Sequence, residues 1–311
     1  MSETSAPSLR LLAAEESAAV QGMTFPTYRP LLALQPVTRH PELGDPVVIQ
    51  PLAVVAWRDA EPRGMVLAET PTTEGRSPEM LSLYVAPEER GRGLATALVA
   101  GLQDALRERG HREVRAVYMT GKPAIETLEH ILARLGWEPP VLRSVTLRFT
   151  PEEALSTPWF GRVVLPEPEF QIFSWAELAA EERAEAERSH VESPWITKGL
   201  EFWNHDRNGF DAVSSVGLRQ RGRVVGWVLN HRLSADIVRF TCSFMRKDLG
   251  RRGRIMPLYT ASLERLRAHG TGTCTFVTPV VHRTMVDFVK RRCAPWASFF
   301  GETRGVVKNL A

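Results

Sequence analysis

The chain has 311 residues, of which 43% are hydrophobic and 24% are charged, and its 39 basic and 36 acidic residues give a formal net charge of +3. The length predicts two domains, because about 100 to 200 residues per domain is usual, and the composition is typical of soluble globular proteins. The small net charge argues against a nucleic-acid partner, and the lack of a long apolar run argues against a membrane span. The three cysteines have no paired spacing, which argues against a metal site. We therefore expect a cytoplasmic protein.

The first half alternates strand-like and helix-like periodicity. Strands are predicted over 9–13, 52–57, 63–69 and 79–85, with an irregular helical region from residue 15 and a hairpin turn at 58–62. Over 93–109 the apolar residues recur at spacings of three and four and Gly110 follows, which predicts a helix. A strand over 114–119, a helix over 124–135 and a strand over 145–149 complete this half.

The second half repeats this order at an offset of roughly 160 residues. Strands are predicted over 170–175, 223–231, 236–245 and 274–279, and helices over 176–189, 255–269 and 283–292. Between the halves, Pro151, Pro158, Pro166 and Pro168 are expected to interrupt any helix. We therefore predict two copies of one domain, at 1–150 and 170–311, with a linker at 151–169.

A glycine-rich turn connects the strand over 79–85 to the helix over 93–109. Backbone N–H groups without partners collect at the positive end of such a helix, and an anion binds there. Gly91 and Gly93 have no side chain to block a phosphate, Ala95 is small, and Arg90 and Arg92 add positive charge. The alternative for so short a motif is a plain connection between strand and helix.

At Arg90, Gly93 and Ala95 the turn resembles the acetyl-CoA signature of the GCN5-related N-acetyltransferase (GNAT) superfamily, Gln/Arg-x-x-Gly-x-Gly/Ala. The order of elements is similar over residues 8–149. The resemblance implies an α/β fold of two tandem GNAT-like domains, each with a mixed, largely antiparallel central sheet flanked by helices. It implies acetyl-CoA as cosubstrate, no metal, and a gap for the pantetheine arm where the strand over 79–85 splays from that over 114–119. The implied coenzyme-binding residues are Leu83, Val85, Arg90, Gly91, Arg92, Gly93, Leu94, Ala95 and Thr96.

Acyl transfer to an amine requires a neutral nucleophile, since an alkyl ammonium with a pKa near about 10 has no free lone pair. Glu79 lies eleven positions before Arg90, where some members of the superfamily carry a glutamate base, and it is the candidate base here. A solvated glutamate at the start of a strand is the alternative. The oxyanion donor is expected around Tyr84 or Val85. Tyr84 lies on the strand face opposite Leu83 and Val85, where it either acts in catalysis or packs.

Three further features have two interpretations each. In the superfamily a tyrosine on the last helix often serves as the general acid, but here Leu132 stands at its position. Tyr118 or His130 could act as the acid instead. A lone histidine on a helix is, however, more often a surface or packing residue. Residues 22–32 roof the acceptor site in relatives, where Arg29 would pair with a substrate carboxylate, or they form a loop that packs its aromatic residues. Residues 193–210 form either an aromatic ligand pocket or a cap over the second core.

The second turn, over 248–255, is a degenerate copy of the first. Gly253 corresponds to Gly93, but Gly250 replaces the leading arginine and Ile255 replaces Ala95, so a branched side chain would crowd a phosphate. Arg251, Arg252 and Arg254 could still bind an anion. The sequence thus predicts an acetyl-CoA-dependent N-acetyltransferase, active in its first half on an amine of a small molecule or peptide. Transfer of another acyl group or to a hydroxyl, and a non-catalytic acyl-CoA sensor or scaffold, are the alternatives; a homodimer is left open.

Overall fold

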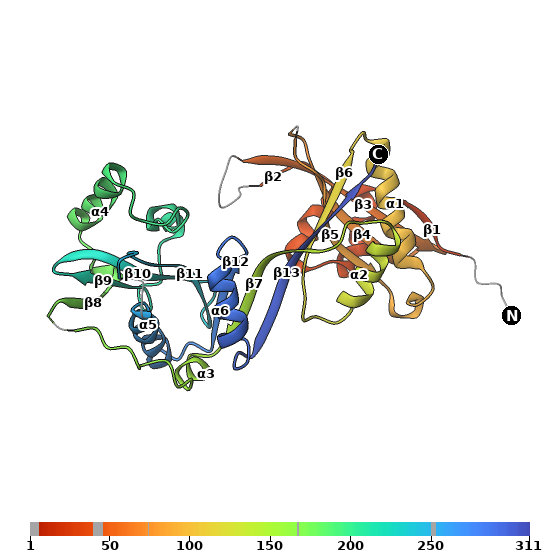
Figure 1. The fold of residues 1–311 in the computed structure, drawn as a ribbon. Coiled ribbons are helices and arrows are strands. Elements are labelled where there is room, and N and C mark those ends of the chain that lie inside the picture. The colour runs from red at the N-terminus through yellow and green to blue at the C-terminus, as the bar shows by residue number, and fades with distance from the viewer. Residues whose placement is uncertain (1–5, 40–45, 74, 167, 250–252) are drawn as a thin grey trace. The chain divides into compact units, whose positions relative to one another are not determined.

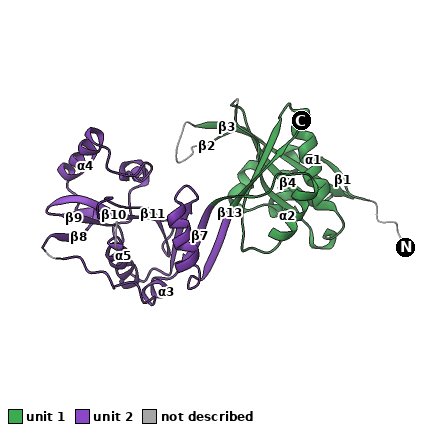
Figure 2. Ribbon diagram, in the orientation of Figure 1, with its two compact units in different colours: residues 1–143, 303–311 green, residues 144–302 purple. Residues whose placement is uncertain are grey.

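A computed structural model describes residues 6–39, 46–73, 75–166, 168–249 and 253–311 of the chain. These residues form two compact units (Figure 2). Unit 1 consists of Met1–Arg143 and Thr303–Ala311, and unit 2 consists of Ser144–Glu302. Both are α/β units with a mixed, mostly antiparallel sheet, as predicted.

The sheet of unit 1 has the strand order β1-β3-β4-β5-β6-β13, and β2 pairs separately with β3. Only β5 and β6 pair in parallel; the other ladders are antiparallel. The strands are β1 (Ser8–Leu11), β2 (Val37–Arg39), β3 (Val47–Arg58), β4 (Glu61–Pro71), β5 (Glu79–Val85), β6 (Glu113–Met119) and β13 (Phe299–Asn309), the last of which belongs to this unit from Thr303 onward. The tight turn between β3 and β4 uses Asp59 and Ala60, both with positive φ, as a two-residue hairpin turn requires.

Two hydrophobic cores form on this sheet. One packs beneath the helices α1 (Leu94–Glu108) and α2 (Ile125–Arg134), and it contains Leu98, Leu102 and Leu132. The other lies beneath the 3₁₀ helices η1 (Ala14–Met23) and η2 (Pro26–Ala33), and it contains Leu32 and Met65. Apolar residues at three- and four-residue spacings give α1 its buried face, and the irregular helical region predicted from residue 15 is the pair η1 and η2. A short 3₁₀ turn, η3 (Pro87–Glu89), precedes α1.

Unit 2 has the strand order β7-β12-β11-β10-β9-β8, again with one parallel pair, β11 and β12. Its strands are β7 (Val141–Phe149), which belongs to this unit from Ser144 onward, β8 (Phe170–Ser174), β9 (Val216–Gln220), β10 (Arg223–Arg232), β11 (Ile237–Met245) and β12 (Thr273–Pro279). Its helical elements are α3 (Pro151–Leu155), η4 (Trp175–Glu177), α4 (Ala180–Glu192), η5 (Phe202–Asn204), η6 (Asp206–Asn208), α5 (Met256–Ala268), α6 (Arg283–Phe288) and the π-helical segment η8 (Val289–Cys293) (Figure 1).

Each unit contains a strand from the other half of the chain. Thr303–Asn309 of β13 pair with β6 in unit 1, and Leu310 is buried in the core beneath α1. In return Ser144–Phe149 of β7 pair with β12 in unit 2. The compact units therefore differ from the predicted limits at 150 and 170, because the last residues of the chain belong to unit 1 and the end of the first half belongs to unit 2.

The internal repeat is visible in the register of the backbone. β6 (Glu113–Met119) and β12 (Thr273–Pro279) have the same length and are offset by 160 residues. Each neighbouring strand has a bulge at a corresponding residue, Leu81 in β5 and Thr241 in β11. Each parallel ladder ends at a corresponding pair, Met80–Ala116 and Phe240–Phe276. The two units therefore have the same strand framework, bulge included.

Some expectations were wrong. The proline-rich segment contains the helix α3, since Pro151 occupies its first turn, where a missing N–H costs nothing, and Thr150 and Glu153 form a capping box. The strands β2, β9 and β13 were not predicted, and the helix predicted over 283–292 changes from α to π at Val289.

Candidate active site

The turn before α1 has the backbone conformation of an anion site. Gly91 and Gly93 have φ values of 75° and 82°, which glycine adopts without strain. A Cβ atom built on either glycine would meet no atom within 4 Å, so the space beside the turn is open. No side chain of a described residue caps α1, whose first intrahelical bond runs from Ala97 N–H to the carbonyl of Gly93. The N–H groups of Leu94, Ala95 and Thr96 are therefore available to a phosphate.

The residues of this turn differ in their exposure to solvent. Arg90, Gly91, Arg92 and Gly93 are exposed, whereas Leu94 is buried in the core. Ala95 and Thr96 are half-buried, and Ala95 packs against the same core. Leu94 and Ala95 can thus offer a ligand their backbone, and the two arginines can offer charge.

A buried ion pair fixes the turn to the sheet. Glu89 of η3 is 3% exposed, and its carboxylate accepts hydrogen bonds from both terminal nitrogens of Arg58 at the end of β3, one of them at 3.1 Å. On the exposed side of η3, Glu88 pairs with Arg63 at 3.0 Å. No sequence pattern pointed to the pair of Arg58 and Glu89, because its partners lie 31 positions apart.

Beside the turn, β5 loses its parallel partner. The ladder with β6 consists of the pairs Glu79–Arg115 and Met80–Ala116, and the rest of β5 pairs only with β4. The N–H of Ala86 donates to Arg63 of β4, so by the alternation of an antiparallel strand the backbone groups of Val85 and Leu83 point to the side that β6 has left. Nε of Arg90 donates to the carbonyl of Val85 at 3.1 Å, which fits this direction. Two N–H groups thus face a gap at the start of the turn.

Glu79 lies at the paired end of β5. Its carboxylate forms an ion pair of 2.9 Å with Nε of Arg115. Burial raises the pKa of Glu79 above its ordinary value, although Arg115 opposes the shift. The pKa of Tyr28 on η2 is raised as well, mainly by burial and in part by the negative charge of Glu79. The carboxylate of Glu79 and the phenol of Tyr28 therefore interact electrostatically. A raised pKa makes a carboxylate a stronger base than one in water, which is the direction that a general base requires.

The candidate tyrosines lie in different surroundings. Tyr84 is half-buried and absent from the core that contains Leu83 and Val85, which fits its predicted place on the opposite face of β5. The hydroxyl of Tyr118 on β6 donates to Glu129 of α2 at 2.8 Å, and Arg304 of β13 also donates to Glu129 at 2.9 Å. Burial and the hydrogen bond to Glu129 raise the pKa of Tyr118, so this phenol stays protonated at neutral pH.

The other positions discussed for the acid have no such contact. His130 is exposed on α2, as a surface histidine would be, and Leu132 is buried in the core. Sequence reasoning named Tyr118 but missed Glu129 and Arg304, of which the second comes from the far end of the chain.

The segment expected to roof the acceptor site is held on β5. The hydroxyl groups of Thr24 and Ser82 lie 2.7 Å apart, and Tyr28 packs against the core beneath η1 and η2. Phe25 is 59% exposed and contacts the edge of Tyr28, and Arg29 is exposed as well. The aromatic residues therefore divide between packing and exposure.

Residues 27–132 match the model of the acetyltransferase (GNAT) family, which includes β5, the glycine turn, α1 and β6. The fold of the whole chain is similar to two solved structures. One is a tandem GNAT protein from the clavulanic acid biosynthesis pathway, with a TM-score of 0.57 at 14% identity over 98% of this chain and 99% of that one. The other is a GCN5-related N-acetyltransferase from Sphaerobacter thermophilus, with a TM-score of 0.55 at 15% identity over 98% and 96%. The chain therefore has the fold of a tandem GNAT protein. A sequence comparison with curated proteins finds no match.

Unit 2 has the same strand framework as unit 1 but different side chains at the positions of the candidate site. Gly253 has a φ of 70°, like Gly93, while Gly250, Arg251 and Arg252 lie outside the described residues. Arg239 stands at the position that corresponds to Glu79, and Phe276 stands at that of Ala116. The described part of unit 2 therefore has no carboxylate where unit 1 has its candidate base.

Aromatic and aliphatic residues within 193–210 pack over the second core, and Thr197 and Leu200 of the same segment line a pocket. Ile196 and Phe202 are buried with Trp175 and Trp227, and Trp195, Trp203 and Phe210 pack against them. His205 and Asp206 do not form a pair, since Nε2 of His205 contacts the carbonyl of Gly199 and Asp206 pairs with Arg183.

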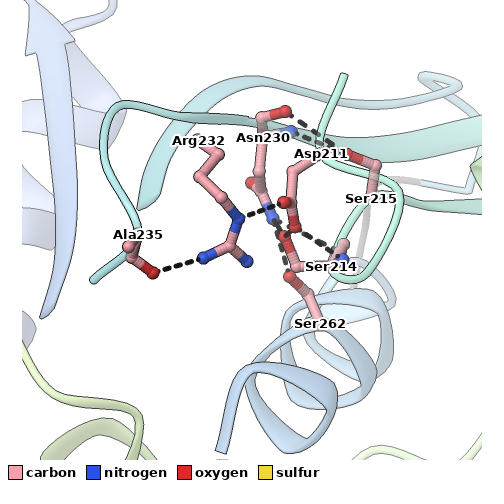
Figure 3. A network of polar contacts seen from close by, with 7 residues as sticks. All are labelled: Asp211, Ser214, Ser215, Asn230, Arg232, Ala235 and Ser262. Carbon is pink, nitrogen blue, oxygen red and sulfur yellow. Dashed lines mark hydrogen bonds and ion pairs between the residues drawn. The ribbon is translucent and has the colours of Figure 1, made fainter. Parts of the chain in front are cut away.

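A buried polar network lies between β10, α5 and the loop before β9 (Figure 3). Nδ2 of Asn230, which is fully buried, donates to the hydroxyl groups of Ser214 and Ser262, both at 2.9 Å. Asp211 accepts from Ser214 and from Nε of Arg232 at 2.7 Å. Burial alone would raise the pKa of Asp211, but these hydrogen bonds outweigh it and lower the pKa. The network connects a helix, a strand and a loop, which suits a structural role.

The described residues include neither a cluster of potential metal ligands nor a helix that could span a membrane. Within the described ranges, no three His, Cys, Asp or Glu side chains gather in a way that could hold a metal ion. No helix in the same ranges has the length and apolarity needed to cross a membrane.

Proposed function

We propose that the protein transfers an acetyl group from acetyl-CoA to an amine of a small molecule or peptide, and that unit 1 is the active unit. The GNAT match supports an acyl-CoA-dependent acetyltransferase at the level of the family. The assignment of the coenzyme to unit 1 is supported mainly by one observation. The parallel ladder of β5 and β6 ends at Met80–Ala116, and β5 then leads into an open glycine turn and an uncapped helix. This arrangement fits a ligand with a slender arm and an anionic pyrophosphate.

The residues of unit 1 divide the binding work. The N–H groups of Leu94, Ala95 and Thr96, with Arg90 and Arg92, would hold the pyrophosphate, because helix N-termini and arginines both favour anions. Leu83 and Val85 would hold the pantetheine arm through their backbone. Bound acetyl-CoA supplies the thioester, whose thiolate leaving group has an ordinary pKa of about 8.5 and requires little acid assistance.

Glu79 would accept the proton from the amine, directly or through one water molecule, and so expose the nitrogen lone pair. A backbone N–H of the unpaired stretch of β5, around Tyr84 or Val85, would then donate to the carbonyl oxygen as it gains negative charge. Alignment of the two substrates supplies a further part of the rate, since a fixed geometry replaces a bimolecular encounter. The side chain of Tyr84 belongs to the same stretch and would border the acceptor.

The test measures coenzyme binding and turnover separately. Calorimetric titration with acetyl-CoA should give one site per chain, which Gly93→Glu abolishes and the matched Gly253→Glu preserves. Release of free thiol across a panel of amines and alcohols, repeated with Glu79→Gln, then identifies the acceptor class. Two equivalent coenzyme sites, or a Gly93→Glu variant of unchanged affinity, would refute the assignment to unit 1. Coenzyme binding without turnover on any acceptor would favour the sensor, and faster turnover of other acyl-CoA thioesters or of alcohols would favour the other transferases.

A further inference from the structure

Unit 2 contains a cavity of about 660 Å³ that the proposed acetyl transfer does not use. Pockets for small molecules usually have volumes of about 300 to 1,000 Å³ and are lined mainly by apolar and aromatic groups. The floor of this cavity is the sheet, through Leu147, Phe149, Phe240 and Phe276. Its walls are α5, α6 and the π-helical segment η8, through Met256, Tyr259, Met285, Phe288, Val289 and Cys293.

One end of the cavity is built of aromatic rings that support one another. Trp159 stacks on Phe160 with ring centroids 4.4 Å apart, and it meets Phe288 edge-on at 5.6 Å. Trp296 lies 5.4 Å from Phe149 in the same edge-on manner. All five residues line the cavity. Such rings give an apolar ligand a large and rigid contact surface.

The repeat shows that this apolar character belongs to unit 2. At the 160-residue offset, Ile255, Met256 and Phe276 correspond to Ala95, Thr96 and Ala116 of unit 1. All three line the cavity, and each is larger and more apolar than its counterpart. The larger side chains at these three positions take up space that is free in unit 1, and they line the remaining space with apolar surface. The cavity therefore suits a different ligand from the one proposed for unit 1.

Among the described residues that line the cavity, one is an arginine. Arg283, with its neighbours His282 and Thr284, lines the cavity, and its side chain is exposed. In the part of the chain that the structure describes, no carboxylate pairs with Arg283. An exposed arginine at the mouth of an apolar cavity can hold a carboxylate with a charge-assisted hydrogen bond while the rest of the ligand enters.

We propose that the cavity of unit 2 binds a small molecule with an apolar body and a single carboxylate, such as a medium-chain fatty acid, with the carboxylate on Arg283 and the body between the rings of Phe149, Phe276 and Trp296. The proposal does not depend on catalysis in unit 1.

Titration calorimetry of the full-length protein with octanoate and decanoate tests the proposal. One site per chain is expected, with an affinity that rises about fourfold for each added methylene group, as its burial implies. Decylamine, which has the same chain and the opposite charge, should bind at least about tenfold more weakly. Equal binding of decanoate and decylamine, or no binding of either, would overturn the proposal.

Two substitutions locate the site. Arg283→Gln should weaken decanoate about tenfold, the loss of one charge-assisted bond, while Arg291→Gln, an exposed arginine of η8 outside the lining, should leave it unchanged. Met285→Trp should fill the cavity and reduce binding further. Equal behaviour of the two arginine variants would refute the role of Arg283. Gly93→Glu should still bind decanoate; if acetyl-CoA displaces decanoate from this variant, the cavity is a coenzyme site and the proposal fails.

Discussion

The ion pair between Arg58 and Glu89 yields the sharpest prediction for unit 1. The side chains of Arg58 and Glu89 are 12% and 3% exposed, so Glu89→Gln would remove a buried carboxylate that accepts two hydrogen bonds from Arg58 beneath the turn. Breaking a buried pair costs about 3 to 5 kcal/mol in the free energy of unfolding, and we expect about 3 kcal/mol because glutamine still accepts one hydrogen bond. The loss of this anchor directly before Arg90 should also weaken acetyl-CoA about tenfold.

The adjacent Glu88 is the matched control, since it also pairs with an arginine but is 56% exposed. Exposed pairs contribute about 0 to 1 kcal/mol, so Glu88→Gln should change the free energy of unfolding and coenzyme affinity little. Denaturant titration gives the free energy, and calorimetric titration gives the affinity. If Glu89→Gln behaves like Glu88→Gln in both measurements, burial of the pair does not support the turn and the reasoning is refuted.

Three further predictions concern other parts of the chain. Asn230→Ala should destabilise unit 2 by about 3 kcal/mol, because buried serine oxygens lose their donor, whereas the exposed Asn208→Ala should have little effect in the same denaturant titration. Leu310 is 1% exposed, so Leu310→Ala should destabilise unit 1 by about 2 kcal/mol, whereas Val141→Ala at an exposed position should not. Equal changes in the free energy of unfolding would contradict the burial of Leu310 in the core of unit 1. Since burial raises the pKa of Glu79, kcat/KM should rise with pH through that raised value, and Glu79→Gln should remove this limb of the profile.

The same pKa shift has a consequence for stability. A carboxyl group whose folded pKa lies above its ordinary value of 4.5 binds its proton more tightly in the folded state. Its contribution to stability is therefore complete below that ordinary value and is lost as the pH rises through the raised pKa. Glu79→Gln should flatten this part of the stability profile, and an unchanged profile would show that Glu79 is not buried enough to matter.

Local patterns predicted the elements around the candidate site. β5 has the predicted bounds because Pro87 ends it, and α1 follows from its apolar spacing and Gly110. Long-range pairing could not be predicted in this way. β13 has glycines at 301 and 305 that interrupt its alternation, and its partner β6 lies far away in the sequence. The pair of Arg58 and Glu89 and the contacts of Glu129 with Tyr118 and Arg304 depend on such pairing, so no local signal reveals them.

The two units show how one backbone can support two kinds of site. The bulge, the end of the parallel ladder and the left-handed glycine recur at corresponding positions, and these features shape the gap beside the parallel strands. The side chains around the gap diverge: Glu79 corresponds to Arg239, and Ala116 corresponds to Phe276. Because a base and an acceptor site require particular side chains, and unit 2 lacks the carboxylate that corresponds to Glu79, we expect chemistry in unit 1 only. In unit 2 larger apolar residues enclose a cavity, so the duplicated framework would recognise a second ligand without repeating the reaction.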